Sequence, residues 1–307
     1  MTDELPLKRE MTFTYGEPRE LCPGVVRIVA NNPGPFTFKG TNTYLLGRNS
    51  LAVIDPGPED AAQCAAILKA AGDRPITHIV VTHTHHDHVG GLTALQQATG
   101  ALSCGFGRRA RNEGATIRSP SGGEYVDRDF NPDVVLGDGA RLEGAEWALE
   151  ALHTPGHAPD HLCLALAGTG VLFSGDHVMS WSTSVVAPPE GNMADYMRGL
   201  ERLMERSDAL YLPGHGGQLE QPQRVARAFL THRRIREQAI LGCIRDGHRT
   251  IDRIVPIIYQ GLDERLVRAA SMSVLAHIEH LIQRREIVTC DGAPSGLATA
   301  YEPASGR

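Results

Sequence analysis

The chain has 307 residues, of which 41% are hydrophobic and 21% charged, with a formal net charge of −6. This composition is typical of a soluble globular chain with room for one large domain and one small one. No apolar run approaches the roughly 20 residues that a membrane helix needs, so we expect no membrane partner. Residues 1–20 carry charges of both signs without an apolar core, and we expect neither a signal peptide nor a membrane anchor there.

The charge distribution and the cysteines bear on the binding partners and on the cellular compartment of the protein. From Arg224 onward, 13 basic residues stand against 9 acidic ones, a net charge of +4, whereas the residues before it sum to −10. A mildly basic tail permits contact with nucleic acid but falls short of the basic footprint that predicts it. The six cysteines include no Cys-x-x-Cys pair, which fits buried thiols in a reducing compartment. We therefore expect a cytoplasmic protein.

The first part of the chain predicts three antiparallel strands and a helix. The strands are expected at residues 25–30, 43–46 and 51–54. A helix is expected over residues 58–71, with a proline in its first turn and Gly72 at its end. Asp55, which follows the third strand, is either a turn residue or a carboxylate that orients a histidine ligand through the second N–H of its ring.

The segment 77–91, THIVVTHTHHDHVGG, places four potential metal ligands within six positions at the end of a β-branched run. In an extended backbone His83 and His85 point the same way and can hold one ion. Asp87 and His88 follow where the chain turns into a helix, so they face a different point and suit a second ion. An isolated histidine is more often a core or surface residue, but four donors at this spacing indicate two neighbouring metal sites.

The pattern His-x-His-x-Asp-His resembles the signature of the metallo-β-lactamase superfamily. This resemblance implies three more ligands, each at the end of a strand. Candidates that follow a hydrophobic run and a glycine are His157, Asp176 and His215. By resemblance, His83, His85 and His157 hold a first metal ion, Asp87, His88 and His215 hold a second, and Asp176 bridges them. Imidazole and carboxylate donors without thiolate favour two zinc ions, although iron and manganese also suit such donors.

The middle of the chain predicts a second set of strands. Residues 105–133 show no periodicity and predict a surface excursion, in which Arg108, Arg109 and Arg111 are either a solvated face or a contact to an anionic substrate. The strands are expected at residues 134–136, 141–142, 147–152, 162–166 and 171–173. Two half-domains of strands and helices then meet with the ligands at one edge. This arrangement is the α/β, four-layer αββα sandwich of the metallo-β-lactamase fold.

A long loop, residues 177–192, follows Asp176, and long loops in compact domains are often functional lids. His177 and Trp181 either line a substrate pocket or pack within the loop. His161 is expected to support a ligand rather than bind a metal, because seven ligands already satisfy two ions. An amphipathic helix is expected over residues 195–206.

The C-terminal part predicts a winged-helix domain. Helices are expected from residue 221, over 251–259 and over 263–285, and a β-hairpin is expected with strands at 286–290 and 297–301. We divide the chain into a catalytic domain, residues 1–222, and a winged-helix domain, residues 223–307. The winged helix either contacts nucleic acid or serves as a packing or dimerisation module, so a homodimer is a further expectation.

Several segments together resemble the β-lactamase-like protein 2 family over nearly the whole chain. They are Asn32-Pro33-Gly34-Pro35, Gly40-Thr41-Asn42-Thr43-Tyr44-Leu45, the seven ligands, Asp195-Tyr196-Met197, His232-Arg233-Arg234-Ile235-Arg236-Glu237 and the C-terminal tail. The resemblance implies a two-zinc hydrolase with a C-terminal winged helix. Relatives of this kind include an endoribonuclease acting on single-stranded RNA and thioesterases.

The implied chemistry is hydrolysis by a metal-bridging hydroxide, because two metal ions lower the pKa of a shared water to about 7. Asp87 and Asp176 are the expected catalytic carboxylates, and Asp87 is both a ligand and a candidate proton shuttle. An aspartate rather than a cysteine at position 176 disfavours β-lactam cleavage. We expect an ester, thioester or lactone as the small acyl substrate. The alternatives are an endoribonuclease acting on single-stranded RNA and a non-enzymatic module that binds nucleic acid or protein.

Overall fold

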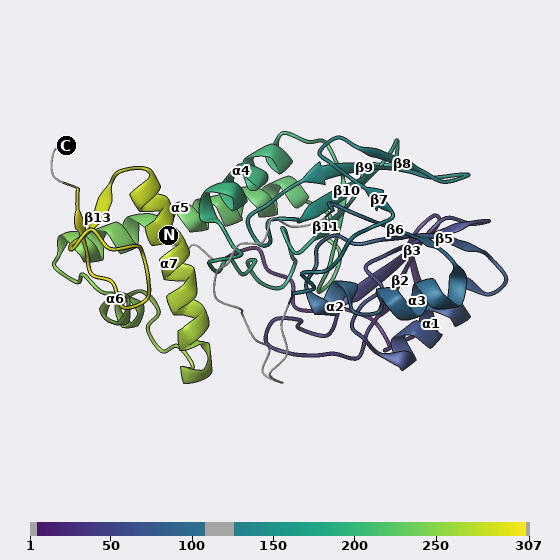
Figure 1. Cartoon of the computed structure of the whole chain (residues 1–307), viewed down its shortest axis with the longest axis horizontal. Coiled ribbons are helices and arrows are strands. Elements are labelled where there is room, and N and C mark those ends of the chain that lie inside the picture. The colour runs from purple at the N-terminus through teal and green to yellow at the C-terminus, as the bar shows by residue number, and fades with distance from the viewer. Residues whose placement is uncertain (1–4, 108–125, 305–307) are drawn as a thin grey trace.

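Two β-sheets packed face to face form the core of the larger part of the molecule, on the right in Figure 1. The computed structural model describes residues 5–107 and 126–304. The expected cluster of Arg108, Arg109 and Arg111 lies outside these residues. In the described part of the chain, no helix has both the length and the apolar character needed to cross a membrane.

The first sheet has seven strands that lie side by side in chain order. They are β1 (Arg19–Cys22), β2 (Val25–Val29), β3 (Asn42–Leu46), β4 (Leu51–Ile54), β5 (Ile76–Val80), β6 (Leu102–Gly105) and β7 (Val134–Val135). The strands from β1 to β4 pair antiparallel, and those from β4 to β7 pair parallel. The change follows from the connections, because α1 (Ala61–Ala71) and α3 (Leu92–Thr99) cross over between parallel neighbours.

The second sheet has five strands in the order β12-β11-β10-β9-β8. They are β8 (Arg141–Glu143), β9 (Ala148–His153), β10 (Leu162–Leu166), β11 (Val171–Gly175) and β12 (Leu210–Pro213). Helix α4 (Met193–Met204) connects β11 to β12, which is the parallel pair of this sheet. Its first turn is capped by Asn192, whose side chain accepts a hydrogen bond from the Asp195 amide.

The layers are helix, sheet, sheet, helix, as the sequence predicts. Between the sheets lies an apolar core that includes Tyr44, Ile54, Phe173 and Leu212. Helices α1 and α3 cover the outer face of the first sheet, and α4 covers that of the second (Figure 1). Burial of apolar surface on both faces of each sheet holds the four layers together.

The C-terminal part contains three helices and a short hairpin. They are α5 (Pro222–Arg245), α6 (Ile251–Ile258), α7 (Val267–Gln283), β13 (Ile287–Thr289) and β14 (Tyr301–Pro303), with a 3-10 turn at Glu264–Leu266. The domain division at residue 222, which stays a prediction, falls at the start of α5. That helix serves two cores, because Phe229 packs with α4 whereas Ile240 packs with α6 and α7.

Several predicted boundaries were wrong by two to four residues, and two of them have a clear physical cause. Helix α1 begins at Ala61 rather than at Pro58, because Asp60 has an extended backbone and its side chain caps the Ala62 amide. The second hairpin strand is Tyr301–Pro303 rather than 297–301. The Tyr301 ring is fully buried and its hydroxyl donates to the Gly296 carbonyl, so residues 297–300 make a turn that brings this ring into the core.

A buried carboxylate joins α5 to α7. The Glu237 side chain is 1% exposed and accepts from His277 and His280, at 3.5 and 2.5 Å, with Arg284 at 3.5 Å. Burial raises the pKa of Glu237, but the hydrogen bonds from the two histidines outweigh it and lower the pKa to about 2. The carboxylate is therefore ionised at neutral pH and holds the two helices at one crossing point.

We predict that Glu237→Gln lowers the free energy of unfolding by about 1–3 kcal/mol at pH 7, because it leaves buried donors without a charged acceptor. The folded pKa lies below its ordinary value of 4.5, so the difference is fully present above that pH and disappears as pH falls towards 2. Urea unfolding monitored by circular dichroism checks both points. Glu201→Gln, which breaks an exposed pair with Arg234, is the matched control and should change stability by less than about 0.5 kcal/mol.

Candidate metal centre

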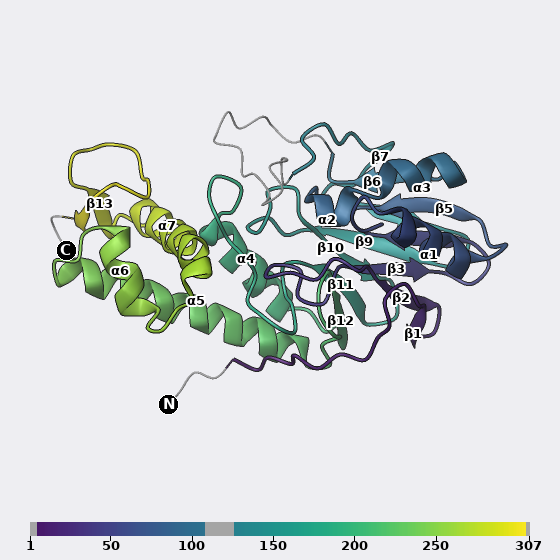
Figure 2. The same ribbon diagram turned by 90° about the horizontal axis from the view of Figure 1, so that it is seen from below.

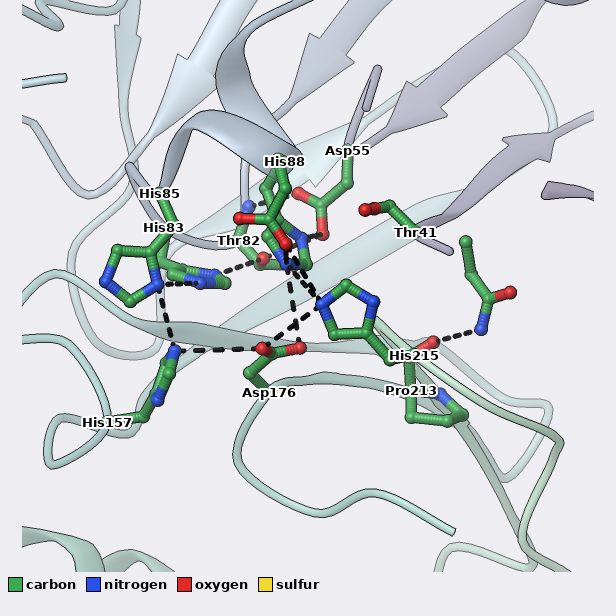
Figure 3. A network of polar contacts seen from close by, with 12 residues as sticks. Thr41, Asp55, Thr82, His83, His85, His88, His157, Asp176, Pro213 and His215 are labelled. Carbon is green, nitrogen blue, oxygen red and sulfur yellow. Dashed lines mark hydrogen bonds and ion pairs between the residues drawn. The ribbon is translucent and has the colours of Figure 1, made fainter. Parts of the chain in front are cut away.

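The structure brings all seven predicted ligands together at one edge of the sandwich, and Figure 3 shows the five histidines with Asp176. His83, His85, Asp87 and His88 lie on the segment that leads from β5 into α2 (His86–Val89). His157 follows β9, Asp176 follows β11 and His215 follows β12. Strands of both sheets therefore end around one buried space, as expected where ligand-bearing loops share an edge.

The first cluster consists of His83, His85 and His157. The Nδ1 atom of His85 lies 2.9 Å from Nε2 of His83 and 3.0 Å from Nε2 of His157. A tetrahedral ion with bonds of about 2.0–2.1 Å to nitrogen separates its ligand atoms by about 3.3 Å. The three nitrogens thus lie near the spacing that such an ion requires.

The second cluster consists of Asp87, His88 and His215. The Nε2 atoms of His88 and His215 are 3.2 Å apart, and Oδ2 of Asp87 lies 3.1 Å from Nε2 of His215 and 3.5 Å from Nε2 of His88. The Asp87 Oδ1 atom is buried and has no hydrogen-bond partner among the described residues. Two imidazole nitrogens and a carboxylate are donors that zinc commonly takes.

Asp176 lies between the two clusters (Figure 3). Its Oδ2 atom is 3.7 Å from Nε2 of His157 and 3.4 Å from Nε2 of His215, while Oδ1 is 3.6 Å from Nε2 of His88. Within the described residues Oδ1 has no hydrogen-bond partner. One carboxylate therefore reaches donors of both sites, which is the arrangement that a bridging ligand needs.

The ionisation of these groups suits cations. Burial lowers the pKa of His83 and His85 well below the ordinary value, helped by neighbouring histidines, so their lone pairs are available. Burial raises the pKa of Asp176, but His215 and His88 outweigh it and hold this carboxyl ionised. Burial lowers the pKa of His88, whereas Asp87 and Asp176 raise it to about 9. The carboxylates thus favour positive charge at this point, and the donor set fits one divalent ion in each cluster.

Each of four imidazoles is oriented by a partner on its outer nitrogen. Nδ1 of His88 donates to Asp55, Nδ1 of His83 to the Thr82 hydroxyl, Nδ1 of His157 to the Val185 carbonyl and Nδ1 of His215 to the Gly40 carbonyl. Carbonyl and carboxylate oxygens can only accept, and the Thr82 hydroxyl already donates to Asp55. In the neutral form of each ring the proton therefore sits on Nδ1, and Nε2 would present its lone pair to a bound cation.

Asp55 accepts three of the hydrogen bonds that hold the ligand segment in place. Its Oδ1 accepts from the Thr82 amide at 2.7 Å, and its Oδ2 accepts from the Thr82 hydroxyl and from His88, both at 2.8 Å. Its backbone is left-handed, with φ of 51°. Asp is among the few residues that adopt this conformation at low cost, so the turn and the carboxylate are two functions of one residue.

His161 and two glycines position Asp176. The Asp176 amide donates to Nε2 of His161 at 3.0 Å, and Nδ1 of His161 in turn contacts the Thr154 hydroxyl at 2.9 Å. His161 thus contacts the backbone of a ligand and not the centre of either cluster. A Cβ atom on Gly214 would lie 2.4 Å from Oδ1 of Asp176, and one on Gly175 would lie 2.5 Å from Nε2 of His161. Only glycine leaves room for these side chains.

Comparison with known proteins agrees with this geometry. The profile of the metallo-beta-lactamase superfamily matches residues 36–215, which is more than half of the chain. The chain belongs to the metallo-beta-lactamase superfamily. The beta-lactamase associated winged helix domain matches residues 250–292. The superfamily match spans all seven ligands, and the winged-helix match begins in the loop before α6.

Individual relatives cover most of the molecule. A beta-lactamase-like protein 2 homolog of Drosophila melanogaster is 31% identical over 299 residues, covering 93% of this chain and 96% of that protein. An atrochrysone carboxyl ACP thioesterase of Claviceps purpurea is 29% identical, covering 80% and 75%. The crystal structure of a metallo-beta-lactamase family protein from Thermus thermophilus has a TM-score of 0.73 at 24% identity, covering 92% and 100%. The predicted family and fold are confirmed.

The two residues predicted as candidates for the substrate pocket lie in different environments. The His177 ring is fully buried against Tyr196 and Gly199 of α4. Trp181 is half-buried and stacks on Phe38, with ring centroids 4.8 Å apart. It also packs on Gly216, next to the ligand His215.

Sequence reasoning missed the residues that hold the His215 loop. The Asn42 side chain is buried and donates to the Pro213 and Gly216 carbonyls, both at 2.8 Å, and the Tyr44 hydroxyl donates to Pro213 at 2.7 Å. Both residues lie on β3, some 170 positions before His215 in the sequence. The segment that contains them contributed to the family resemblance, but no function was predicted for either residue. A polar residue such as Asn42 on a buried strand needs a hydrogen-bond partner, and this is the sequence signal that could have identified it.

We predict that Asp55→Asn weakens zinc binding about ten- to a hundredfold, the usual cost of losing a carboxylate that orients a ligand histidine. Asparagine tolerates the left-handed backbone, so the turn is preserved. Competition titration against a chromophoric chelator measures the affinity, and the thermal unfolding midpoint reports on folding. Glu59→Gln, an exposed carboxylate in the same loop, is the matched control. Equal affinities for Asp55→Asn and the unaltered protein would contradict the assignment.

Proposed function

We propose that this protein is a dinuclear-zinc hydrolase that cleaves a small acyl substrate, an ester, thioester or lactone. The observation that carries the proposal is the position of Asp176, whose two oxygens lie within 3.4 to 3.7 Å of ligand nitrogens from both clusters. A carboxylate shared in this way serves two ions better than one. The all-nitrogen and oxygen donor set supports zinc, and iron or manganese are the alternatives.

Two bound zinc ions would supply Lewis acidity for the substrate oxygen and a water that ionises near neutral pH. The chain itself orients the donors through Nδ1 of four imidazoles and keeps the centre shielded by burial. Asp87 is the most exposed of the seven ligands, with its side chain 12% exposed, and its Oδ1 lacks a hydrogen-bond partner in the described chain. We assign Asp87 to accept the proton of the attacking water and pass it towards the leaving group.

A protein nucleophile is not required by this arrangement. Cys163 is the cysteine of the second sheet that contacts Thr154 near His161, but burial raises the pKa of its thiol to about 12. At neutral pH it is protonated and a poor nucleophile. The proposal that water attacks directly is consistent with this state.

Two observations support an acyl substrate. Trp181 and Phe38 form a stacked apolar wall beside the His215 loop, which suits an acyl chain better than a phosphate. Relatives that cover most of the chain are named as thioesterases. A thiolate leaves without strong acid assistance, so among acyl substrates we favour a thioester.

A second candidate function, cleavage of single-stranded RNA, is favoured by one surface feature. A cavity of about 1150 Å³ lies between residues 5–10 and α5, and Lys8, Arg9 and Arg236 are among its lining. Figure 2 shows the N-terminal segment running beside this helix. Three cations against one carboxylate, Glu10, suit a phosphate-bearing ligand. A thioester whose thiol carrier bears a phosphate group would also fit this cavity.

The six cysteines are all free thiols, and Cys104, Cys163 and Cys243 are buried. This supports a reducing compartment, and we propose the cytoplasm. A homodimer built through the winged helix remains our proposal for assembly.

We predict that the zinc-loaded protein hydrolyses acyl thioesters and that Asp176→Ala lowers kcat/KM by roughly 10²- to 10³-fold, the scale of removing one group that stabilises transition-state charge. Release of free thiol, followed with a thiol-reactive dye, measures the rate. Glu59→Gln is again the control with full activity. Equal rates for Asp176→Ala and the unaltered protein would end the hydrolase proposal.

The RNA candidate is tested with an unstructured oligoribonucleotide under the same loading. If RNA is the substrate, cleavage should depend on Asp176 and binding should weaken steeply as salt rises, because phosphate contacts release counterions. Thioester hydrolysis is expected to depend much less on salt. RNA cleavage without thioester hydrolysis would replace the leading proposal.

A further inference from the structure

Helix α5 carries a buried positive charge, Arg233, that points towards the catalytic body. The residue is 3% exposed, and among the described residues it forms no ion pair with a carboxylate within 4 Å. Burying a guanidinium without a counter-charge is costly. Its neighbour Arg234 is exposed and pairs with Glu201, so the environment of Arg233 is specific to that position.

Two contacts hold the Arg233 guanidinium. Its Nη2 atom donates to the Ser184 carbonyl at 2.5 Å, and its Cζ lies 5.2 Å from the centre of the Tyr196 ring. The ring belongs to α4 and provides a cation–π contact. A charged donor makes a stronger hydrogen bond to a carbonyl than a neutral one does. Arg233 therefore fixes the backbone of the 177–192 loop at Ser184.

The next residue of that loop holds a metal ligand. The Val185 carbonyl accepts a 2.6 Å hydrogen bond from Nδ1 of His157, which turns Nε2 of His157 towards His85 and Asp176. Val185 is 39% exposed, so its own packing does little to place that carbonyl. Its position depends on Ser184 on one side and on the buried Val186 on the other.

The second cluster has a separate support. His215 is oriented by the Gly40 carbonyl, and its loop is held by Asn42 and Tyr44 of β3. None of these groups contacts α5 through a hydrogen bond in the described structure. A substitution of Arg233 should therefore weaken metal binding at the cluster that contains His157 and leave metal binding at the cluster that contains His215 unchanged.

We propose that Arg233 is a positioning residue for His157, so that the helix leading into the C-terminal domain sets the metal affinity of the first cluster. Arg233 holds the Ser184 carbonyl, and this contact fixes the neighbouring Val185 carbonyl. The Val185 carbonyl then accepts the hydrogen bond that orients His157. The proposal rests on the dinuclear site of the proposed function but not on any substrate. Helix α5 would then do more than pack between the two cores. It is held by α7 through Glu237, and it would hold the 177–192 loop through Arg233.

The test is stepwise zinc affinity, measured by competition with a chromophoric chelator on the full chain. His157→Gln and His215→Gln first identify which binding step belongs to which cluster. Arg233→Met, which keeps the apolar stem but removes the donor, is expected to weaken the His157 step about ten- to a hundredfold. The His215 step should stay unchanged. Arg233→Lys keeps the charge and one donor and should recover part of the loss.

Two controls separate positioning from general loosening. Glu237→Gln lies one turn further along α5 and should lower the thermal midpoint without changing either zinc affinity. Arg234→Ala should change neither the midpoint nor the affinities. If Arg233→Met does not fold, Arg233→Lys decides: a selective loss at the His157 step supports the proposal, and unchanged affinities overturn it.

The remaining outcomes are also decisive. Equal losses at both steps, or an affinity pattern shared by Arg233→Met and Glu237→Gln, would show a general structural effect and overturn the proposal. An unaltered protein that binds fewer than two zinc ions would overturn the dinuclear function itself, and this proposal with it. Two tight ions that Arg233→Met leaves undisturbed would overturn the role of Arg233 alone.

Discussion

The structure depends on one constraint, the close approach of six polar side chains around one buried carboxylate, Asp176. Asp176 is surrounded by imidazoles from several loops, and nitrogens that would otherwise face water lie about 3 Å apart. Such a cluster is costly to bury unless cations are bound and each group has its hydrogen-bond partners. The fold meets the second requirement with Nδ1 partners for four rings, and the donor set is of a kind that could hold the cations.

The partners of the ligands come from distant parts of the chain. Asp55 and Gly40 lie in loops next to strands β4 and β3 of the first sheet, whereas Val185 belongs to the loop that follows Asp176. Two sheets that meet face to face bring their strand ends to a shared edge, so each sheet contributes ligands and supports to the other. The apolar core between the sheets therefore stabilises the geometry of the site as well as the fold.

The C-terminal domain is joined to this site by a continuous helix. The first half of α5 packs against α4, and its second half enters the core of the winged helix. Arg233 and Glu237 lie one turn apart, and they contact the 177–192 loop and α7 respectively. A helix shared by two cores cannot shift in one domain without moving in the other. The relative placement of the two domains is therefore a determinant of the loop that holds His157.

The sequence by itself predicted the fold class and four candidate ligands, and the family resemblance that it carries added the other three. Alternating hydrophobic runs indicated the two sheets, and the density of donors at His83 to His88 indicated two metals, because both patterns are local. Most element boundaries followed to within a few residues, except where Asp60 and the buried Tyr301 decided them. Only the tertiary structure showed how Asn42, the Gly40 and Val185 carbonyls and Arg233 support the ligands. Backbone carbonyls carry no sequence signal, and contacts across 170 positions depend on how the sheets pack, which no local pattern encodes.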